Sequence, residues 1–97
     1  MRESFETINN IDFVELDIHG YTKYETQTDL PRIMVEYFES GYTHFNIVHG
    51  FRSGNILQIY VRTKLKHDIL RIKSCKEIKV LPKNDGDTIF AISGDLK

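Results

Sequence analysis

Two short segments of this chain share one pattern, in which an apolar strand ends on His-Gly and a helical pattern follows. Residues 13–18 read as a strand that leads into His19-Gly20, and residues 43–48 lead into His49-Gly50. Strands that are joined by a helical crossover pair in parallel, so their carboxyl ends lie at the same edge of one sheet. Ligands usually bind in the crevice outside that edge. We therefore expect the functional site between the two His-Gly pairs.

The segment between these pairs predicts a helix. Thr22 and Glu25 have the spacing of a capping box, and Gly41 marks the end. Pro31 lies inside the pattern and predicts a kink, or a loose first turn before a helix that begins near Asp29. The apolar stripe recurs at i, i+3, i+4, i+7 and i+8: Leu30, Ile33, Met34, Tyr37 and Phe38.

The second half of the chain predicts another helix and a hairpin. Residues 56–65 carry an apolar stripe, and residues 67–76 either continue this helix or serve as a linker. Strands over 77–81 and 88–92 flank a turn that contains Asp85-Gly86, which is typical of a hairpin.

The element order is βαβαββ. It predicts an α/β two-layer sandwich, with a four-stranded mixed sheet and two helices on one face. Residues 1–10 are polar and lack a clear period, so we expect a flexible N-terminal arm before an α/β domain over residues 11–97.

The composition limits the classes of protein. A chain of 97 residues is one domain, and no apolar run approaches the ~20 residues of a membrane span. The single cysteine, Cys75, cannot form an internal disulfide. The N-terminus, with Glu3 and Glu6, does not resemble a signal peptide. We expect a cytoplasmic protein with no membrane contact.

The charges are unevenly distributed along the chain. The formal net charge is −1, yet residues 1–50 sum to −6 and residues 51–97 sum to +5. Such asymmetry indicates a polyanionic partner that approaches from one side. Lysines and arginines on ordinary solvent-exposed faces explain the same charge asymmetry, and both interpretations stay open here.

The two motifs resemble those of one known family. Leu16-Asp17-Ile18-His19-Gly20 and, after the predicted helix, Ile47-Val48-His49-Gly50 are similar to the Leu-Asp-x-His-Gly and His-Gly-x-Gly-x-Gly motifs of the Smr (small MutS-related) domain. The resemblance runs from about residue 13 to about residue 92. It implies a βαβαββ fold and nucleic-acid binding, with nicking or single-strand endonuclease activity in some members. Arg52 replaces the middle glycine of the second motif, and its guanidinium offers a bidentate phosphate contact instead.

Three residues form the predicted catalytic set: Asp17, His19 and His49. Hydrolysis of a phosphodiester needs a base for the nucleophile and an acid for the leaving oxygen, and histidine titrates close to neutral pH. Asp17 shares a strand face with His19 and either orients that imidazole or binds a divalent metal together with a histidine. Because no pair has the spacing of His-x-x-x-His, we expect no cofactor, and a divalent metal held by Asp17 and a histidine is the alternative.

A second set of residues is predicted to contact nucleic acid. Glycines in a loop that feeds a helix leave backbone N–H groups free for phosphate, and aromatic rings beside it can stack on a splayed base. The set comprises Gly20, Tyr21, Gly50, Phe51, Arg52, Ser53, Gly54 and Arg62.

Three function classes remain from the sequence. The first is a small endonuclease that acts on RNA or on branched or nicked DNA, and the second is a non-catalytic nucleic-acid-binding module. The third, a protein-interaction or small-ligand domain, fits the modest net charge. The sequence leaves the substrate, the metal requirement and the oligomeric state open.

Overall fold

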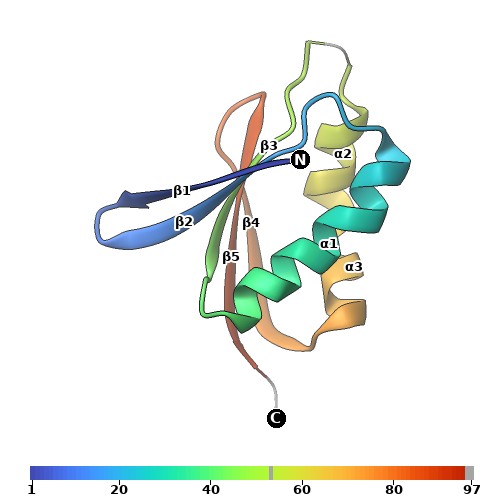
Figure 1. Cartoon of the computed structure of the whole chain (residues 1–97). Helices are drawn as coiled ribbons and strands as arrows, with labels where there is room; N and C mark the ends of the chain where they lie inside the picture. Colours follow the sequence, from blue (N-terminus) through green and yellow to red (C-terminus); the bar gives the residue numbers. More distant parts are fainter. Residues whose placement is uncertain (53, 96–97) are drawn as a thin grey trace.

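The computed structural model describes residues 1–52 and 54–95. Over these residues the chain forms a five-stranded sheet with three helices on one face (Figure 1). The strands are β1 (Arg2–Ile8), β2 (Ile11–Asp17), β3 (His44–Val48), β4 (Cys75–Pro82) and β5 (Asp87–Asp95). The helices are α1 (Lys23–Glu39), α2 (Ile56–Thr63) and α3 (Leu65–Ile72). None of these described helices is long and apolar enough to cross a membrane.

The strands follow the spatial order β1-β2-β3-β5-β4. β2 and β3 are parallel neighbours, with Asp17 opposite Val48, as the two strand–His-Gly–helix units predicted. β4 and β5 form an antiparallel hairpin, and β5 pairs antiparallel with β3. The mixed α/β sheet is therefore confirmed, but it contains five strands rather than the expected four.

The fifth strand is β1, in the segment that we expected to be a flexible arm. It pairs antiparallel with β2 along its whole length, so the prediction of an arm over residues 1–10 is wrong. Asn9 and Asn10 connect the two strands with φ angles of 52° and 65°. A two-residue hairpin turn requires this left-handed pair, and asparagine tolerates it. The strand was missed because every residue of β1 is exposed, so no buried face imposes an alternating pattern.

The helical layer also differs from the prediction. The expected second helix is two helices, which meet at Lys64. Apolar residues continue at i+4 across this bend, as Val61, Leu65 and Ile69, so the periodicity gives no sign of it. α1 begins at Lys23 behind the capping box of Thr22 and continues through Pro31, so the alternative start near Asp29 is wrong.

The core lies between the sheet and the helices. Alternate residues of β2, β3 and β5 point toward the helices and are fully or almost fully buried: Val14, Leu16, Phe45, Ile47, Phe90 and Ile92. They pack against the inner sides of α1, α2 and α3, including Leu30, Met34, Tyr60, Val61, Leu65 and Ile69. The opposite face of the sheet carries no helix (Figure 1). Ile56, which we expected in the buried stripe, is 62% exposed at the start of α2.

One partly buried hydrogen bond joins α2 to α3 across the bend. The Tyr60 hydroxyl donates to Asp68 Oδ2 at 2.6 Å, and burial together with this carboxylate raises the pKa of Tyr60. Tyr60→Phe should lower the free energy of unfolding by about 1–2 kcal/mol, because it leaves a partly buried carboxylate without its donor. Urea unfolding measures the change. Tyr24→Phe, at a ring that is 76% exposed, is the matched control and should change stability by less than about 0.5 kcal/mol.

Candidate functional site

A cleft of about 650 Å³ opens at the carboxyl ends of β2 and β3. The starts of α1 and α2 and the turn between β4 and β5 complete its walls. Eight of the predicted site residues line it: His19, Gly20, Tyr21, His49, Gly50, Phe51, Arg52 and Gly54. Ser53 lies outside the described residues. The structure therefore brings both His-Gly pairs to one cleft, where the parallel pairing of β2 and β3 placed them.

The two His-Gly corners lie side by side. Ile18 N donates to Val48 O at 2.9 Å, which extends the parallel pairing to the residue before His19. Gly50 has φ +71°, and a Cβ on it would lie 3.6 Å from the Cβ of His19. The backbone N–H groups of His49 and Gly50 both donate to Gly86 O, at 2.9 and 3.0 Å. The β4–β5 turn thus holds the second corner in place.

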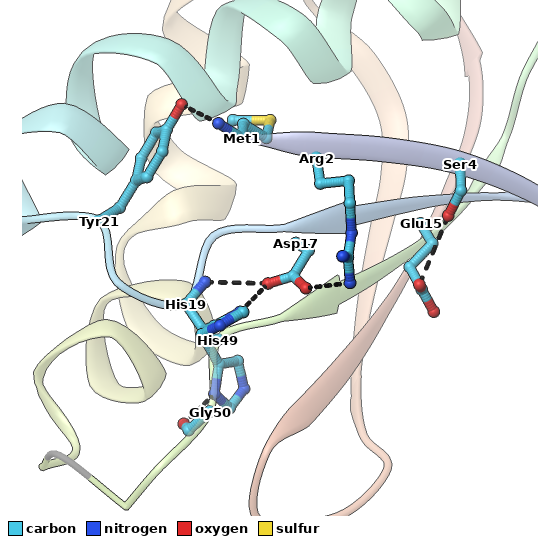
Figure 2. Close-up of polar contacts among 9 residues, drawn as sticks. All are labelled: Met1, Arg2, Ser4, Glu15, Asp17, His19, Tyr21, His49 and Gly50. Carbon is cyan, nitrogen blue, oxygen red and sulfur yellow. Dashed lines mark hydrogen bonds and ion pairs between the residues drawn. The ribbon is translucent and has the colours of Figure 1, made fainter.

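Asp17 and His19 form a hydrogen-bonded dyad (Figure 2). Asp17 Oδ1 accepts from the backbone N–H of His19 at 3.1 Å and from Nδ1 of its ring at 2.5 Å. The Asp17 side chain is 9% exposed, whereas that of His19 is 68% exposed. Because a carboxylate only accepts, Nδ1 carries the single proton of the neutral ring, and Nε2 of that ring keeps its lone pair. Among the described residues none bonds to Nε2, so His19 is equipped to accept a proton from a bound molecule.

His49 occupies a different environment. It is 4% exposed, its Nδ1 donates to Gly50 O at 2.8 Å, and its Nε2 accepts from the Thr88 hydroxyl at 2.9 Å. Thr88 Oγ1 in turn accepts from Arg62 Nε at 2.8 Å. Burial lowers the pKa of His49, and the Arg62 charge adds to this effect, which exceeds the opposing influence of the Gly50 carbonyl and Asp87. His49 is thus a neutral imidazole with both nitrogens bonded, and it holds the corner together.

Arg62 completes the same internal network. Its guanidinium donates to Thr88 Oγ1 and to the backbone carbonyls of Asn84 and Asp87. We expected this side chain on the nucleic-acid-binding surface, but the structure uses it to hold the β4–β5 turn against α2. The sequence could not reveal this role, because its acceptors lie more than 20 residues along the chain.

The start of α2 has the features of an anion site. Its N-cap, Asn55, makes no side-chain capping bond, and no acidic residue lies in its first turn. Free N–H groups and the helix dipole favour a negative ligand there. By contrast, Thr22 and Glu25 close the start of α1 with both bonds of a capping box. Arg52 is not among the described non-glycine residues with positive φ, so it replaces the family glycine without left-handed strain.

The two aromatic residues that were predicted to contact nucleic acid differ in whether their side chains already have a partner. Phe51 is 50% exposed at the cleft and can stack on a base. Tyr21 also lines the cleft, but its hydroxyl accepts from the Met1 nitrogen (Figure 2). Within residues 1–52 and 54–95, no group of three or more His, Cys, Asp or Glu side chains is arranged to hold a metal ion.

The fold and the cleft are those of a small α/β domain with a His-Gly site at one sheet edge. The model of the Smr domain matches residues 16–90, and the chain belongs to the Smr domain family. Among solved structures it is similar to the Smr domain of Thermus thermophilus MutS2, with 22% identity and a TM-score of 0.54 over 80% of this chain and 95% of that one. This likeness concerns the fold. A comparison with curated proteins finds no match.

The state of His49 leads to a prediction about pH. Its pKa is lowered on folding, so the unfolded chain binds a proton first as the pH falls below the ordinary histidine value of about 6.5. The contribution of neutral His49 to the free energy of unfolding is complete above that pH. It is lost as the pH falls toward the lower pKa of the folded state. Between pH 7 and 5.5 the wild type should lose unfolding free energy, by at most about 1.4 kcal/mol per pH unit.

His49→Gln should flatten this slope, and urea unfolding at each pH measures it. His67→Gln changes an exposed histidine on α3 and is the control. Equal slopes in the wild type and His49→Gln would contradict the assignment of a neutral buried imidazole.

Proposed function

We propose that this protein binds nucleic acid in the cleft and hydrolyses a phosphodiester there, with His19 as the general base. One observation carries the proposal: the Asp17–His19 dyad presents an exposed imidazole in the same cleft as the uncapped start of α2. Membership of the Smr family supports the binding of nucleic acid. The cleft supplies a proton acceptor and a place for a phosphate next to each other.

The chemistry follows from these groups. A phosphate held by the N–H groups of α2 exposes its phosphorus to a water molecule beside His19. Nε2 takes a proton from that water while the new P–O bond forms, and the Asp17 carboxylate stabilises the resulting imidazolium. The helix N-terminus stabilises the charge that develops on the phosphate oxygens. The bond to the leaving oxygen then breaks, and this oxygen takes a proton from solvent or from His19.

A second candidate is a binding module without catalysis, and the state of His49 favours it. Both nitrogens of that ring are bonded within the protein, so His49 does not provide the general acid that we expected beside His19. The described residues of the cleft contain no other histidine. In this case the cleft would hold a phosphate and a base without cleaving the chain.

Cleavage assays separate the two candidates. Labelled single-stranded RNA, nicked duplex and supercoiled plasmid are incubated with the wild type, His19→Ala and Asp17→Asn, each with and without EDTA. If His19 is the base, His19→Ala should lower kcat by about 10²–10⁴-fold, the usual contribution of a general base. Its affinity, measured by fluorescence anisotropy, should change less than about threefold, and the EDTA arm reports whether a divalent metal takes part.

The two results have different meanings. Cleavage by the wild type that persists in His19→Ala would exclude His19 as the base. Salt-sensitive binding without cleavage by any variant would support the second candidate, a binding module without catalysis. His67→Ala, at an exposed histidine far along the chain, should behave like the wild type.

The phosphate position on α2 has its own test. Asn55→Asp places a carboxylate at the uncapped helix start, where it should occupy the free N–H groups and repel a phosphate. We expect about tenfold weaker binding of a labelled oligonucleotide and unchanged or slightly higher stability. Asn10→Asp makes the same chemical change at the β1–β2 turn and is the charge-matched control. Equal loss of affinity in both variants would show that only net charge matters.

A further inference from the structure

We infer that Arg2 is a positioning residue for the Asp17–His19 dyad, and this inference rests on the proposed function. Arg2 contacts one carboxylate oxygen of Asp17, and His19 contacts the other (Figure 2). The guanidinium holds the carboxylate in the orientation that fixes the imidazole. Arg2 itself does not touch the reacting atoms.

The sheet register places Arg2 for this role. β1 pairs with β2 so that Arg2 lies directly opposite Asp17. One guanidinium nitrogen, Nη2, lies 3.2 Å from Asp17 Oδ2, while Oδ1 accepts both bonds from His19. The two oxygens therefore have separate partners. Rotation of the carboxylate would break contacts on both sides, so the ring of His19 is held with Nε2 free.

The charges around Asp17 explain why a cation is needed there. The same face of the sheet carries Glu15 and Asp87, and both accept from Asn46 Nδ2, at 3.2 and 3.4 Å. Like charges that lie on one face of a sheet repel one another. Of the lysines and arginines in the described part of the chain, Arg2 forms the ion pair with Asp17. It balances the acidic cluster at the carboxylate that orients His19.

β1 is anchored so that Arg2 is held in place. The strand lies outside the segment that the family model matches, residues 16–90. Phe5 packs its ring on Tyr37 and Tyr42, and Thr7 donates to Asp12 at 2.7 Å. Glu3 accepts a hydrogen bond from the Tyr37 hydroxyl, which raises the pKa of Tyr37 to about 12. β1, which lies outside the matched segment, thus supplies Arg2 as the partner of the motif residue Asp17.

The inference predicts a change in the dyad rather than in stability. The Arg2 side chain is 80% exposed, and such surface pairs contribute little to folding. Arg2→Ala should therefore remain folded, as far-UV circular dichroism would verify. Its effect should appear in the ring of His19 and in the rate of the chemical step.

The first measurement is the tautomer of His19. Nitrogen-15 NMR of the imidazole, recorded well above the ordinary titration range of histidine, should show the Nδ1–H form in the wild type. Arg2→Ala should give a mixture of both tautomers, and Arg2→Lys should restore the Nδ1–H form. Ser4→Ala is the matched control, because Ser4 lies on the same strand and bonds to a different carboxylate, that of Glu15.

The second measurement is the kinetics of cleavage. Arg2→Ala should lower kcat by about tenfold with KM changed less than twofold, because it loosens the base without removing a substrate contact. Arg2→Lys should retain kcat within about threefold. A raised KM with unchanged kcat would instead make Arg2 a substrate contact and overturn the inference.

The NMR result stands apart from the activity. An unchanged tautomer of His19 in Arg2→Ala would overturn the role of Arg2, whether or not the protein cleaves nucleic acid. A tautomer mixture in a protein that cleaves nothing would support the positioning by Arg2 and refute the proposed hydrolysis.

Discussion

The site depends on the parallel pairing of β2 with β3. This pairing aligns Asp17 with Val48 and continues through the bond from Ile18 N to Val48 O, so both chains leave the sheet at one edge. The starts of α1 and α2 then lie at that edge as well, because each helix follows its strand after a short loop. A cleft with helix starts on its walls is the consequence. One ladder of backbone hydrogen bonds therefore decides where the cleft forms.

The same dipeptide serves two different purposes in this cleft. His19 lies in solvent and is oriented by a carboxylate two residues earlier, a local contact that the strand period already indicates. His49 points into the protein, where Thr88 and the carbonyl of Gly50 occupy both of its nitrogens. Burial rather than residue type separates an available base from a neutral structural group. A motif read from sequence assigns both histidines alike, since the partner that distinguishes them lies 39 residues away.

Local signals were sufficient for much of the fold. The capping box of Thr22 and Glu25, the parallel strand pair and the final hairpin rest on short-range patterns, and the structure contains all of them. β1 escaped prediction because it buries no face, and because the turn that leads back to β2 is Asn9-Asn10 rather than a pair that contains glycine. The bend at Lys64 escaped because the apolar spacing continues through it. The roles of Arg2 and Arg62 depend on partners distant in sequence.

The charges on the two sides of the cleft restrict how a polyanion can approach. On the sheet face without helices, Glu15 and Asp87 both bond to Asn46, and Asp17 follows Glu15 on the same face of β2. Such an acidic face repels phosphate groups. On the helical side, the start of α2 is uncapped and Arg52 lines the cleft. Within the proposed function, a nucleic-acid strand therefore enters from the helical side and meets His19 with its phosphate. The dyad lies at the border between the two sides, and Arg2 places a cation on the outer oxygen of Asp17.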